Sequence, residues 1–411
     1  MAKKVEKNII TSLDIGTSKV VALIGELKKD GSIEIIGIGR EPSLGLKRGV
    51  IVDIDATVNS IQRALQAAEL MANCEVRTAY TGIAGSHIRS LNSHGIVAIK
   101  DKEVSPFDVD RVIEAAKAVA IPADQKILHV LPQEFIIDQQ GNIREPAGMA
   151  GVRLEAKVHI VTGAMSSSQN ITKCVRRCGL EVNDIILQQL AASHAVLTED
   201  EKELGVCLLD IGGGTTDIAI FYAGSIKHSA VIPIAGDQVT NDIAMALRTP
   251  TKAAEAIKIQ YGSALPALAS EKEMIDVLSV NDKPVRQISA RALADVICAR
   301  YEELFSLILN ELKRGGYEEH IPAGIILTGG GSRLKGVLEL AEHCFGMPVR
   351  QGMANNIIAP ADINNDPSLT TGVGLLLHGY KQQTTGYYSS AKSVGNKSLW
   401  LRVKEWFKGN F

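Results

Sequence analysis

The chain contains the same short pattern twice. Residues 13–18 read LDIGTS, and residues 209–217 in the middle of the chain read LDIGGGTTD. In each copy a run of apolar and β-branched residues leads into an aspartate, a glycine turn and hydroxyl residues, and a second apolar run follows. This order is typical of two β-strands joined by a glycine turn. The sequence therefore predicts two hairpins of one design, one from each half of the molecule.

Each hairpin turn carries groups that suit a phosphate. Backbone N–H groups freed by a glycine turn can surround an anion, and Ser or Thr hydroxyls add donors without bulk. The aspartate would repel a bare phosphate, so we expect Asp14 and Asp210 to organise Mg²⁺ through water between carboxylate and phosphate. Lys19 is expected either to reach a phosphate or to be a solvated strand residue. The other expected phosphate-binding residues are Gly16, Thr17, Ser18, Gly212, Gly213, Gly214, Thr215 and Thr216.

Other glycine-rich motifs fit these segments poorly. A Walker-type loop or a dinucleotide fingerprint leads from a strand into a helix, whereas both segments here lead into Val- and Ile-rich runs. A plain hairpin turn is the simpler alternative for residues 13–18 taken alone. The repetition of the aspartate and the hydroxyls in the same register argues against that alternative.

A third glycine cluster follows a predicted strand at residues 324–328 and opens a helical pattern. The cluster comprises Gly329, Gly330, Gly331 and Arg333. Because glycine has no side chain, a flat ring can lie directly against the backbone of such a turn. In this order the three segments resemble the superfamily of actin, sugar kinases and heat-shock chaperone ATPases. The resemblance implies that the hairpins are phosphate loops and that the third segment lines an adenosine pocket. It also implies two hinge helices that cross each other closely. Residues 188–195 and 370–376 suit these helices, because their small side chains allow such a close approach. Ordinary helix packing would use small residues too.

The resemblance assigns further roles. Gln188 aligns with the water-orienting Gln or Glu of the superfamily, and a neutral amide is a poor base, so any Mg-dependent ATP hydrolysis should be slow. Asp217 is expected to share the metal or to cap its turn. Four residues match the wall that contacts ribose and adenine, although the last two also suit an exposed helix pair: Gly236, Asp237, Glu255 and Lys258.

Between the two hairpins lies a segment that the superfamily core does not need. It shows a helical pattern at residues 108–120 and strand-like runs at 127–132, 134–138 and 156–161, which predicts a small α+β insert. Residues 129–163 resemble the extra subdomain of the FtsA family, the bacterial division actin homologues. That resemblance runs through residues 131–133, 146–155 and both phosphate loops, and it covers nearly the whole chain.

The resemblance implies an α/β, actin-like two-lobed ATPase fold with an inserted α+β subdomain and a C-terminal amphipathic helix. We expect the first lobe core at residues 1–83, the insert at 84–162, and more first lobe core with a hinge helix at 163–195. The second lobe core is expected at 196–240 and 305–365, with an outer subdomain at 241–304 between them. A second hinge helix at 366–380, a linker at 381–396 and the amphipathic helix at 397–411 complete the expected order.

Composition narrows the class of protein. With 411 residues, 45% hydrophobic and 22% charged, the chain can build two or more ordinary cores. A net charge of −2 provides no general attraction for nucleic acid. The six cysteines show no CxxC or metal-ligand spacing and indicate free thiols in a reducing compartment. Asp14 cuts the first apolar run too short for a signal sequence, and we expect a cytosolic body without a membrane-spanning stretch.

The last residues of the chain have the pattern of a membrane-surface helix. At 100° per residue, the apolar residues fall on one arc and cationic residues on the other side, with Leu401 out of place. Aromatic residues beside Lys and Arg favour a helix lying in the plane of an anionic membrane, although docking on protein is the alternative. Such an anchor is weak alone and gains avidity in a filament. Its apolar arc is Leu399, Trp400, Val403, Trp406, Phe407 and Phe411.

The FtsA resemblance implies partners and a place in the cell. It implies an ATP-binding protein that polymerises on the inner face of the cytoplasmic membrane at the division site, tethers the FtsZ ring there and recruits late division proteins through the insert. The C-terminal tail of FtsZ would dock on a predicted helix at residues 291–310, at Arg300, Tyr301 and Glu303. A small-molecule kinase, a chaperone ATPase and a pilus-assembly actin homologue are the alternatives, and the last is the strongest of them.

Overall fold

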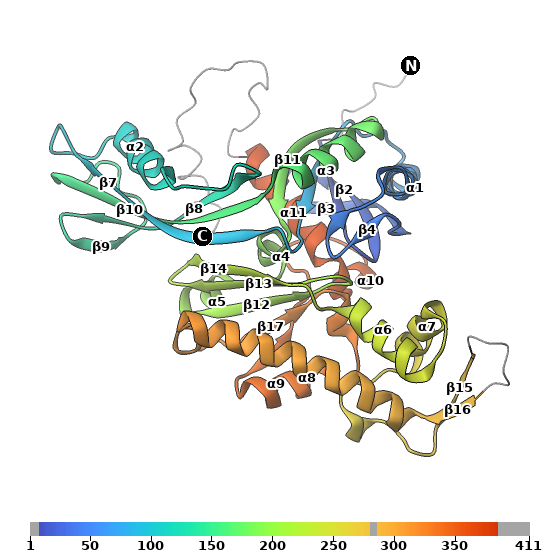
Figure 1. Cartoon of the computed structure of the whole chain (residues 1–411). Coiled ribbons are helices and arrows are strands. Elements are labelled where there is room, and N and C mark those ends of the chain that lie inside the picture. Colours follow the sequence, from blue (N-terminus) through green and yellow to red (C-terminus); the bar gives the residue numbers. More distant parts are fainter. Residues whose placement is uncertain (1–7, 280–285, 385–411) are drawn as a thin grey trace, which may run out of the picture.

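The computed structural model describes residues 8–279 and 286–384 and shows two lobes, with an insert extending from the first (Figure 1). The first lobe is built on a sheet with strand order β11-β6-β1-β2-β3. Helices α1 and α3 pack together on it, and α4 and α11 form a second pair. The strands are β1 (Ile9–Ile15), β2 (Lys19–Leu27), β3 (Ile33–Pro42), β6 (Thr78–Ile83) and β11 (Glu181–Leu187), with a small ribbon of β4 (Leu46–Lys47) and β5 (Val50–Ile51) beside them.

Capping residues set the ends of the long helices. The Asp53 side chain accepts a hydrogen bond from the Ala56 N–H at the start of α1, and Asn73 ends that helix in the left-handed conformation. Ser289 caps α8 in the same way and Gly316 ends it. The first-lobe helices are α1 (Ile54–Ala72), α3 (Met165–Arg177), α4 (Gln188–Val196) and α11 (Thr370–Thr384).

The second lobe has a sheet of the same design, with strand order β14-β13-β12-β17-β18. Its strands are β12 (Val206–Ile211), β13 (Thr216–Tyr222), β14 (Ser225–Ile232), β17 (Ile325–Thr328) and β18 (Val349–Gln351). Its helices are α5 (Glu199–Leu204), α6 (Gly236–Leu247), α7 (Thr251–Tyr261), α8 (Ala290–Gly315), α9 (Val337–Phe345) and α10 (Ala361–Asn364). A ribbon of β15 (Met274–Val277) and β16 (Arg286–Ser289) lies at the outer end, and short 3₁₀ turns are η1 (Pro266–Leu268), η2 (Glu318–His320), η3 (Gly330–Arg333) and η4 (Pro367–Leu369).

Both predicted hairpins are confirmed, and they are built alike. β1 pairs with β2 and β12 pairs with β13, both antiparallel. In the first turn the Gly16 N–H donates to the Lys19 carbonyl at 3.0 Å, and in the second the Gly212 N–H donates to the Thr215 carbonyl at 3.0 Å. Asp14 and Asp210 each stand one residue before the end of their strand. The two carboxylates therefore occupy equivalent places in the two lobes.

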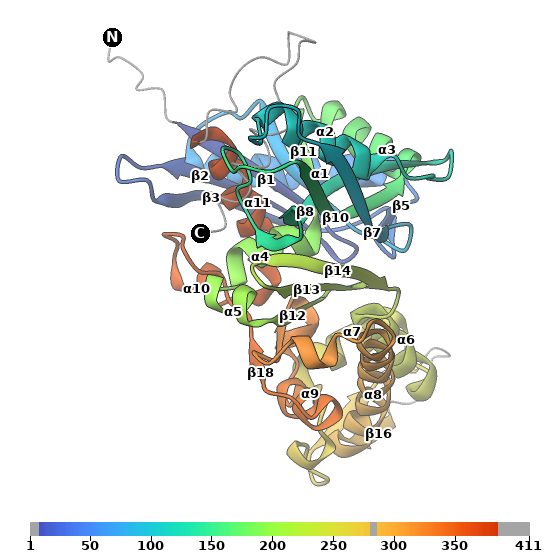
Figure 2. The ribbon, with the colours of Figure 1, turned by 90° about the vertical axis from the view of Figure 1, so that its left-hand side faces the viewer.

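The insert has its own core and a sheet with order β7-β10-β8-β9, covered by α2. Its helix runs from 106 to 117 rather than 108 to 120, because Ser105 and Asp108 form a capping box at its start. The predicted runs at 127–132 and 134–138 are one strand with an irregularity at residue 133. The elements are β7 (Arg89–Ala98), α2 (Pro106–Lys117), β8 (Gln125–Ile137), β9 (Gln140–Ile143) and β10 (Arg153–Ala164). Figure 2 shows β7, β8 and β10 above β14 of the second lobe.

Several expected domain boundaries do not coincide with element ends. α8 is unbroken across residues 304 and 305, because its buried residues continue along the helix to Leu312. α6 crosses the boundary expected at 240 and 241. α11 continues to Thr384, so the first residues of the expected linker are helical. The expected amphipathic helix at 397–411 lies outside the described residues. None of the described helices has the length and apolarity to cross a membrane.

Candidate functional site

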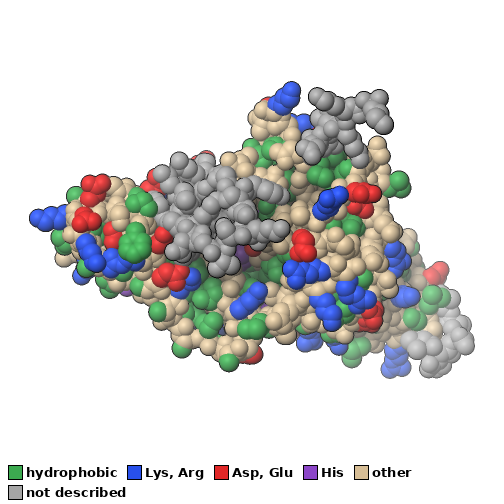
Figure 3. All heavy atoms as spheres, turned by 90° about the horizontal axis from the view of Figure 1, so that it is seen from above, with side chains coloured by type: hydrophobic (Ala, Val, Ile, Leu, Met, Phe, Trp, Pro, Cys, Tyr) green, Lys and Arg blue, Asp and Glu red, His purple; other side chains and the backbone are tan. Residues whose placement is uncertain are grey.

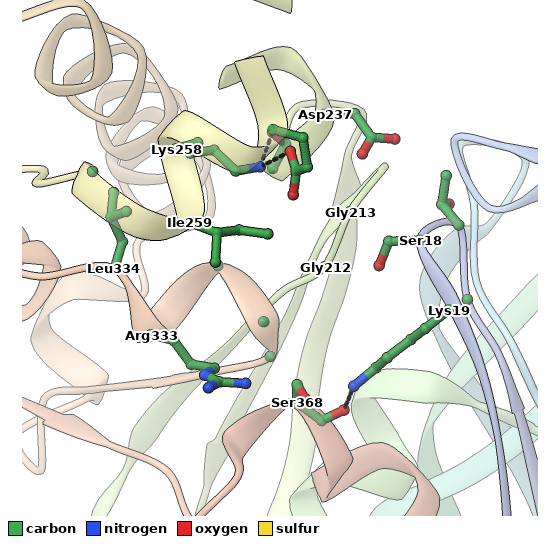
Figure 4. Close-up of a pocket in the computed structure, with 18 of the residues that line it drawn as sticks. Ser18, Lys19, Gly212, Gly213, Asp237, Lys258, Ile259, Arg333, Leu334 and Ser368 are labelled. Atoms are coloured by element: carbon green, nitrogen blue, oxygen red, sulfur yellow. Dashed lines mark hydrogen bonds and ion pairs between the residues drawn. The ribbon is translucent and has the colours of Figure 1, made fainter. Parts of the chain in front are cut away.

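A cavity of about 780 Å³ lies between the two lobes. The two hairpin turns line it from opposite sides, and Figure 4 shows Ser18 of the first turn facing Gly212 and Gly213 of the second. The other predicted nucleotide residues in its wall are Asp14, Gly16, Thr17, Gln188, Asp210, Gly214, Thr215, Gly236, Asp237, Glu255, Lys258, Gly329, Gly330, Gly331 and Arg333. Segments far apart in the sequence therefore meet around one space.

The glycines of the second turn are required by close approach of the first. A Cβ atom on Gly213 would lie 2.9 Å from the Ser18 Cβ, and one on Gly214 would lie 2.6 Å from the Thr17 hydroxyl. Real Cβ atoms do not approach other atoms so closely, so a side chain at either position would push the lobes apart. The Thr17 hydroxyl also accepts a hydrogen bond from the Gly49 N–H at 3.0 Å. Bare backbone at both turns thus holds the hairpins face to face.

Three buried carboxyl groups surround this meeting point. The pKa of Asp14 is raised to about 6, chiefly by burial, which outweighs the lowering by Lys19 and to which the nearby Asp210 adds a smaller rise. Burial raises the pKa of Asp210 too, and the Thr371 hydroxyl donates to its Oδ2 at 2.8 Å. Burial and then Asp210 raise the pKa of Asp217 to about 8. All three carboxylates therefore gain from a cation in the cavity.

The donor set fits hydrated Mg²⁺. Within the described part of the chain, no group of three or more His, Cys, Asp and Glu side chains could by itself hold a metal ion. The Asp217 Oδ1 is buried without a hydrogen-bond partner among the described residues, whereas its Oδ2 accepts from the Thr215 hydroxyl at 3.0 Å. These carboxylates face the cavity but are too few to coordinate a metal ion by themselves. They suit Mg²⁺, which keeps several of its water ligands and also coordinates phosphate oxygens.

Lys19 is directed into the cavity. Its ammonium donates a hydrogen bond to the Ser368 carbonyl, and burial lowers its pKa to about 8. The alternative of a solvated strand residue is therefore wrong. Figure 4 shows the Lys19 side chain reaching across from the first lobe to Ser368. A buried ammonium beside the two hairpin turns suits an anionic ligand.

Gln188 lies at the start of α4, next to the first-lobe carboxylate. Its Nε2 donates to the Asp14 Oδ1 at 3.2 Å. A Cβ atom on Gly82 would lie 2.8 Å from the Gln188 Cγ, so the glycine of β6 makes room for this side chain. The amide is thus fixed at the wall of the cavity, with its carbonyl oxygen available to a water molecule.

The far wall comes from α6 and α7. The Asp237 N–H donates to the Gly213 carbonyl at 2.8 Å, so α6 begins directly beside the second turn. The Lys258 ammonium donates to the Gly236 carbonyl at 3.0 Å and pairs with Glu255 at 2.6 Å. Only 14% of the Lys258 side chain is exposed, so this is not an ordinary surface pair. Ile259 and Leu334 also line this wall (Figure 4) and provide apolar surface for a flat ring.

The third glycine cluster approaches the second-lobe carboxylate. Gly329 has a φ of +82°, and a Cβ atom there would lie 2.2 Å from the Asp210 Oδ1. A Cβ atom on Gly331 would lie 2.3 Å from the Ile211 Cγ2. The cluster forms a 3₁₀ turn, and the helix expected directly after it begins only at Val337. The guanidinium of Arg333 lies 3.4 Å from a carboxylate oxygen of Asp366.

Two expectations need correction. Thr216 does not line the cavity, because its side chain is buried and its hydroxyl donates to the Ile234 carbonyl at 2.8 Å. Tyr301 is only 3% exposed, so its expected role on a partner-binding face is wrong. Its hydroxyl instead donates to the Gly331 carbonyl at 2.9 Å, at the cavity wall. Arg300 and Glu303 form an ion pair on the outer side of α8, and Arg300 also binds Asp242.

Sequence reasoning missed three contributors to the site: Tyr301 as a wall residue, Ser368 and Thr371. Ser368 lies in η4, and Thr371 lies at the start of α11, in the stretch 370–376 noted in the sequence for its small side chains. The adjacent hydroxyls at residues 368, 370 and 371 were an available signal, because hydroxyls at a helix start commonly bind nearby polar groups. For Tyr301 helical spacing was the available signal, because it lies four residues after Ile297 and three before Leu304, on the apolar face of α8.

Comparison with known proteins agrees with this architecture. The chain is 59% identical to the cell division protein FtsA of Pseudomonas aeruginosa over 417 residues, which covers 100% of both chains. Among solved structures, a chain of a PilM-PilN type IV pilus biogenesis complex matches with a TM-score of 0.65 at 16% identity, over 90% of this chain and 98% of that one. MreB 5 of Spiroplasma citri bound to AMPPNP matches with a TM-score of 0.57 at 17% identity, over 92% and 98%.

Those two structural similarities show the fold, which is the actin-like, two-lobed α/β fold with an inserted subdomain. The family model described as cell division protein FtsA matches residues 207–374. The model described as the SHS2 domain inserted in FtsA matches residues 85–162, the segment that forms the α2 insert. Together with the full-length identity of 59%, these matches establish that the chain belongs to the FtsA family of cell division proteins.

Proposed function

We propose that this chain binds ATP with Mg²⁺ in the cavity between its lobes and acts in cell division as a membrane-tethered, actin-like polymer subunit. The observation that carries the nucleotide proposal is the pair of equivalent hairpin turns, which meet with Asp14 and Asp210 behind them. A solved structure of similar fold holds AMPPNP, which supports the same class of ligand here.

In this proposal the hairpin turns and Lys19 bind the β and γ phosphates, and the water shell of Mg²⁺ contacts Asp14 and Asp210. The bound metal would neutralise phosphate charge and offset the burial of the carboxylates. Gln188 orients a water molecule but provides no base, so turnover is slow. The wall formed by Asp237, Lys258 and the glycine cluster at residues 329–331 takes the ribose and the adenine.

The membrane part of the proposal rests on sequence. The apolar arc of the tail, from Leu399 to Phe411, would lie in the membrane surface on the cytoplasmic side at the division site. Filaments would present many weak anchors together and so bind firmly. The same scaffold would tether FtsZ through its C-terminal tail, with Arg300 and Glu303 on the outer side of α8, and would recruit late division proteins through the insert.

The runner-up is a pilus-assembly scaffold, because a PilM-PilN structure shares the fold. Its identity of 16% shows the fold alone, whereas the full-length identity of 59% is to a cell division protein. The difference favours the division role.

A calorimetric titration tests the nucleotide proposal. Asp210→Ala removes a carboxylate expected to hold the hydrated metal, so Mg-ATP binding should be lost while the fold is retained. Asp200→Ala is the matched control, because it removes an exposed carboxylate of α5 outside the cavity. Unchanged Mg-ATP affinity in Asp210→Ala would rule out the assigned clamp, and an equal loss in both variants would show an unspecific effect.

A further inference from the structure

A second pocket, of about 480 Å³, lies along the outer face of α3 in the first lobe. Residues four apart lie on one face of a helix, so residues 168, 172 and 176 form one row and 169, 173 and 177 form the next. No residue in the wall of this pocket is acidic. The wall consists of Lys126, Ser168, Gln169, Thr172, Lys173, Arg176 and Arg177.

This basic pocket has an excess of positive charge. Arg176 pairs with Glu181 at 3.2 Å and Arg177 pairs with Asp55 at 2.7 Å, both at exposed positions where ion pairs are weak. Across residues 8–279 and 286–384, neither Lys126 nor Lys173 has a carboxylate partner. The whole chain has a net charge of −2, so the local excess does not follow from a basic composition. Two uncompensated ammonium groups suit an anion with several oxygens. The Thr172 hydroxyl already donates to the Ser168 carbonyl at 3.0 Å, so it has no proton left for such an anion.

The basic pocket lies close to the point where the tail leaves the described structure. In the last turn of α11, the Gln382 Nε2 donates to the Asp184 Oδ2 at 3.1 Å. Asp184 and Glu181 both belong to β11, three residues apart, which is about 10 Å along a strand. Glu181 in turn binds Arg176 of the pocket. The last described turn of the chain and Arg176 of the pocket therefore contact the same strand, β11.

The figures agree with this placement. α3 and the neighbouring β11 lie in the upper part of the first lobe in both side views (Figures 1 and 2). Figure 3 looks onto this upper face and shows Lys and Arg side chains, with Asp and Glu side chains among them, over the part that belongs to the first lobe. The cavity between the lobes opens elsewhere, since its lining residues and those of the basic pocket have no member in common.

We propose that the basic pocket binds the phosphate groups of anionic lipid headgroups, so that the first lobe itself contacts the membrane beside the tail. The inference rests on the proposed membrane role. A tail inserted at the surface brings the pocket near the lipid charges, and electrostatic attraction reaches about 10 Å at 0.1 M salt. A contact through α3 as well as the tail would fix which face of the subunit points to the membrane, which a tether alone does not do.

Sedimentation of the full-length protein with vesicles tests this contact. Lys126→Gln combined with Lys173→Gln should weaken binding to phosphatidylglycerol-containing vesicles roughly fivefold for each charge removed, about 25-fold in all. Lys252→Gln combined with Lys272→Gln is the matched control, because it removes two exposed lysines of the second lobe. Each variant should bind Mg-ATP as the unaltered protein does, which also checks folding.

Separate arms distinguish the possible failures. Equal losses in the pocket variant and in the control would mean a general charge effect and would overturn the inference, as would no loss in the pocket variant. Binding of inorganic phosphate without vesicles that the pocket variant loses, together with unchanged vesicle binding by that variant, would assign the pocket to a free anion instead. Trp406→Glu combined with Phe407→Glu tests the tail alone. Full vesicle binding by that variant would contradict the proposed tail anchor, whatever the pocket variant does.

Discussion

At the scale of single residues, the buried carboxylates of the cavity lower the stability of the protein without ligand. Asp217 shows this clearly, because its pKa is raised from the ordinary value of 3.8 to about 8. Below about pH 4 its carboxyl group is protonated in the folded and the unfolded states alike. Between 3.8 and about 8 only the unfolded state is ionised, so each rise in pH lowers the free energy of unfolding; above 8 the penalty stays constant.

Asp217→Asn should therefore stabilise the nucleotide-free protein, and the gain should grow between pH 5 and pH 8 and then level off. The gain is on the order of a few kcal/mol, because one pKa unit corresponds to about 1.4 kcal/mol. Denaturant unfolding at several pH values measures it. A difference between the variant and the unaltered protein that stays constant from pH 5 to pH 8 would contradict the raised pKa.

Gln188→Ala separates binding from turnover. The amide contacts the Asp14 Oδ1 at 3.2 Å and is expected to orient water rather than to hold the phosphates. The variant should keep its ATP affinity and lose most of the hydrolysis that the protein performs. Calorimetry and a phosphate-release assay give the two quantities. Undiminished hydrolysis would show that the water-positioning role is wrong.

At the scale of elements, the crossing of α4 and α11 depends on an absent side chain. A Cβ atom on Gly374 would lie 1.8 Å from the Ala191 carbonyl oxygen, in the backbone of the facing helix. A backbone atom cannot turn aside as a side chain can. The small residues of the two hinge helices therefore allow the backbones to touch, and they fix how the lobes are joined.

Gly374→Ala should destabilise the protein by about 1 to 3 kcal/mol, because overpacking outweighs the better helix propensity of alanine. Gly372→Ala, two residues earlier in the same helix, is the matched control. Its Cβ atom would first meet the flexible Leu23 Cδ1, at 3.1 Å. Denaturant unfolding compares the two, and an equal effect in both variants would mean that the crossing tolerates a side chain at Gly374.

At the scale of the whole molecule, the insert connects the lobes at a second place besides the hinge. The Gln133 Nε2 donates to the Ile226 carbonyl of β14 at 2.9 Å. The Ser90 hydroxyl donates to the Ser229 carbonyl at 2.7 Å, and the His159 Nε2 lies 2.9 Å from the Ser229 hydroxyl. The insert belongs to the first lobe by sequence and contacts the second lobe along this polar seam, so a rotation of the lobes would have to change these bonds.

The tail gives a prediction for the whole molecule. Trp406→Glu combined with Phe407→Glu places two charges in the apolar arc, a cost of several kcal/mol that a weak anchor cannot offset. The variant should leave anionic liposomes and lose its position at the division site, yet still bind ATP. Sedimentation, localisation in cells and calorimetry measure the three effects. Lost ATP binding would show that the tail belongs to the core.

The sequence by itself determined the local features of this protein. The two hairpins, the insert and the nearness of Asp14 and Asp210 to their turns follow from patterns that strands and glycine turns impose on neighbouring residues. These patterns also led to the family, which the comparisons show. Most residues expected at the nucleotide site belong to turns that are set locally, but it is the tertiary fold that brings these distant turns around one cavity.

Only the tertiary structure decided the contacts between side chains that are far apart in the sequence. Tyr301 lies on the apolar face of α8 that helical spacing predicts, but its hydrogen bond to the Gly331 carbonyl joins distant segments and belongs to no local pattern. Thr216 turns away from the cavity because the Ile234 carbonyl needs a donor. The basic pocket on α3 and the polar seam of the insert likewise join residues from separate strands and helices. Packing between elements fixes these contacts, whereas sequence periodicity specifies the element and the face on which each residue stands.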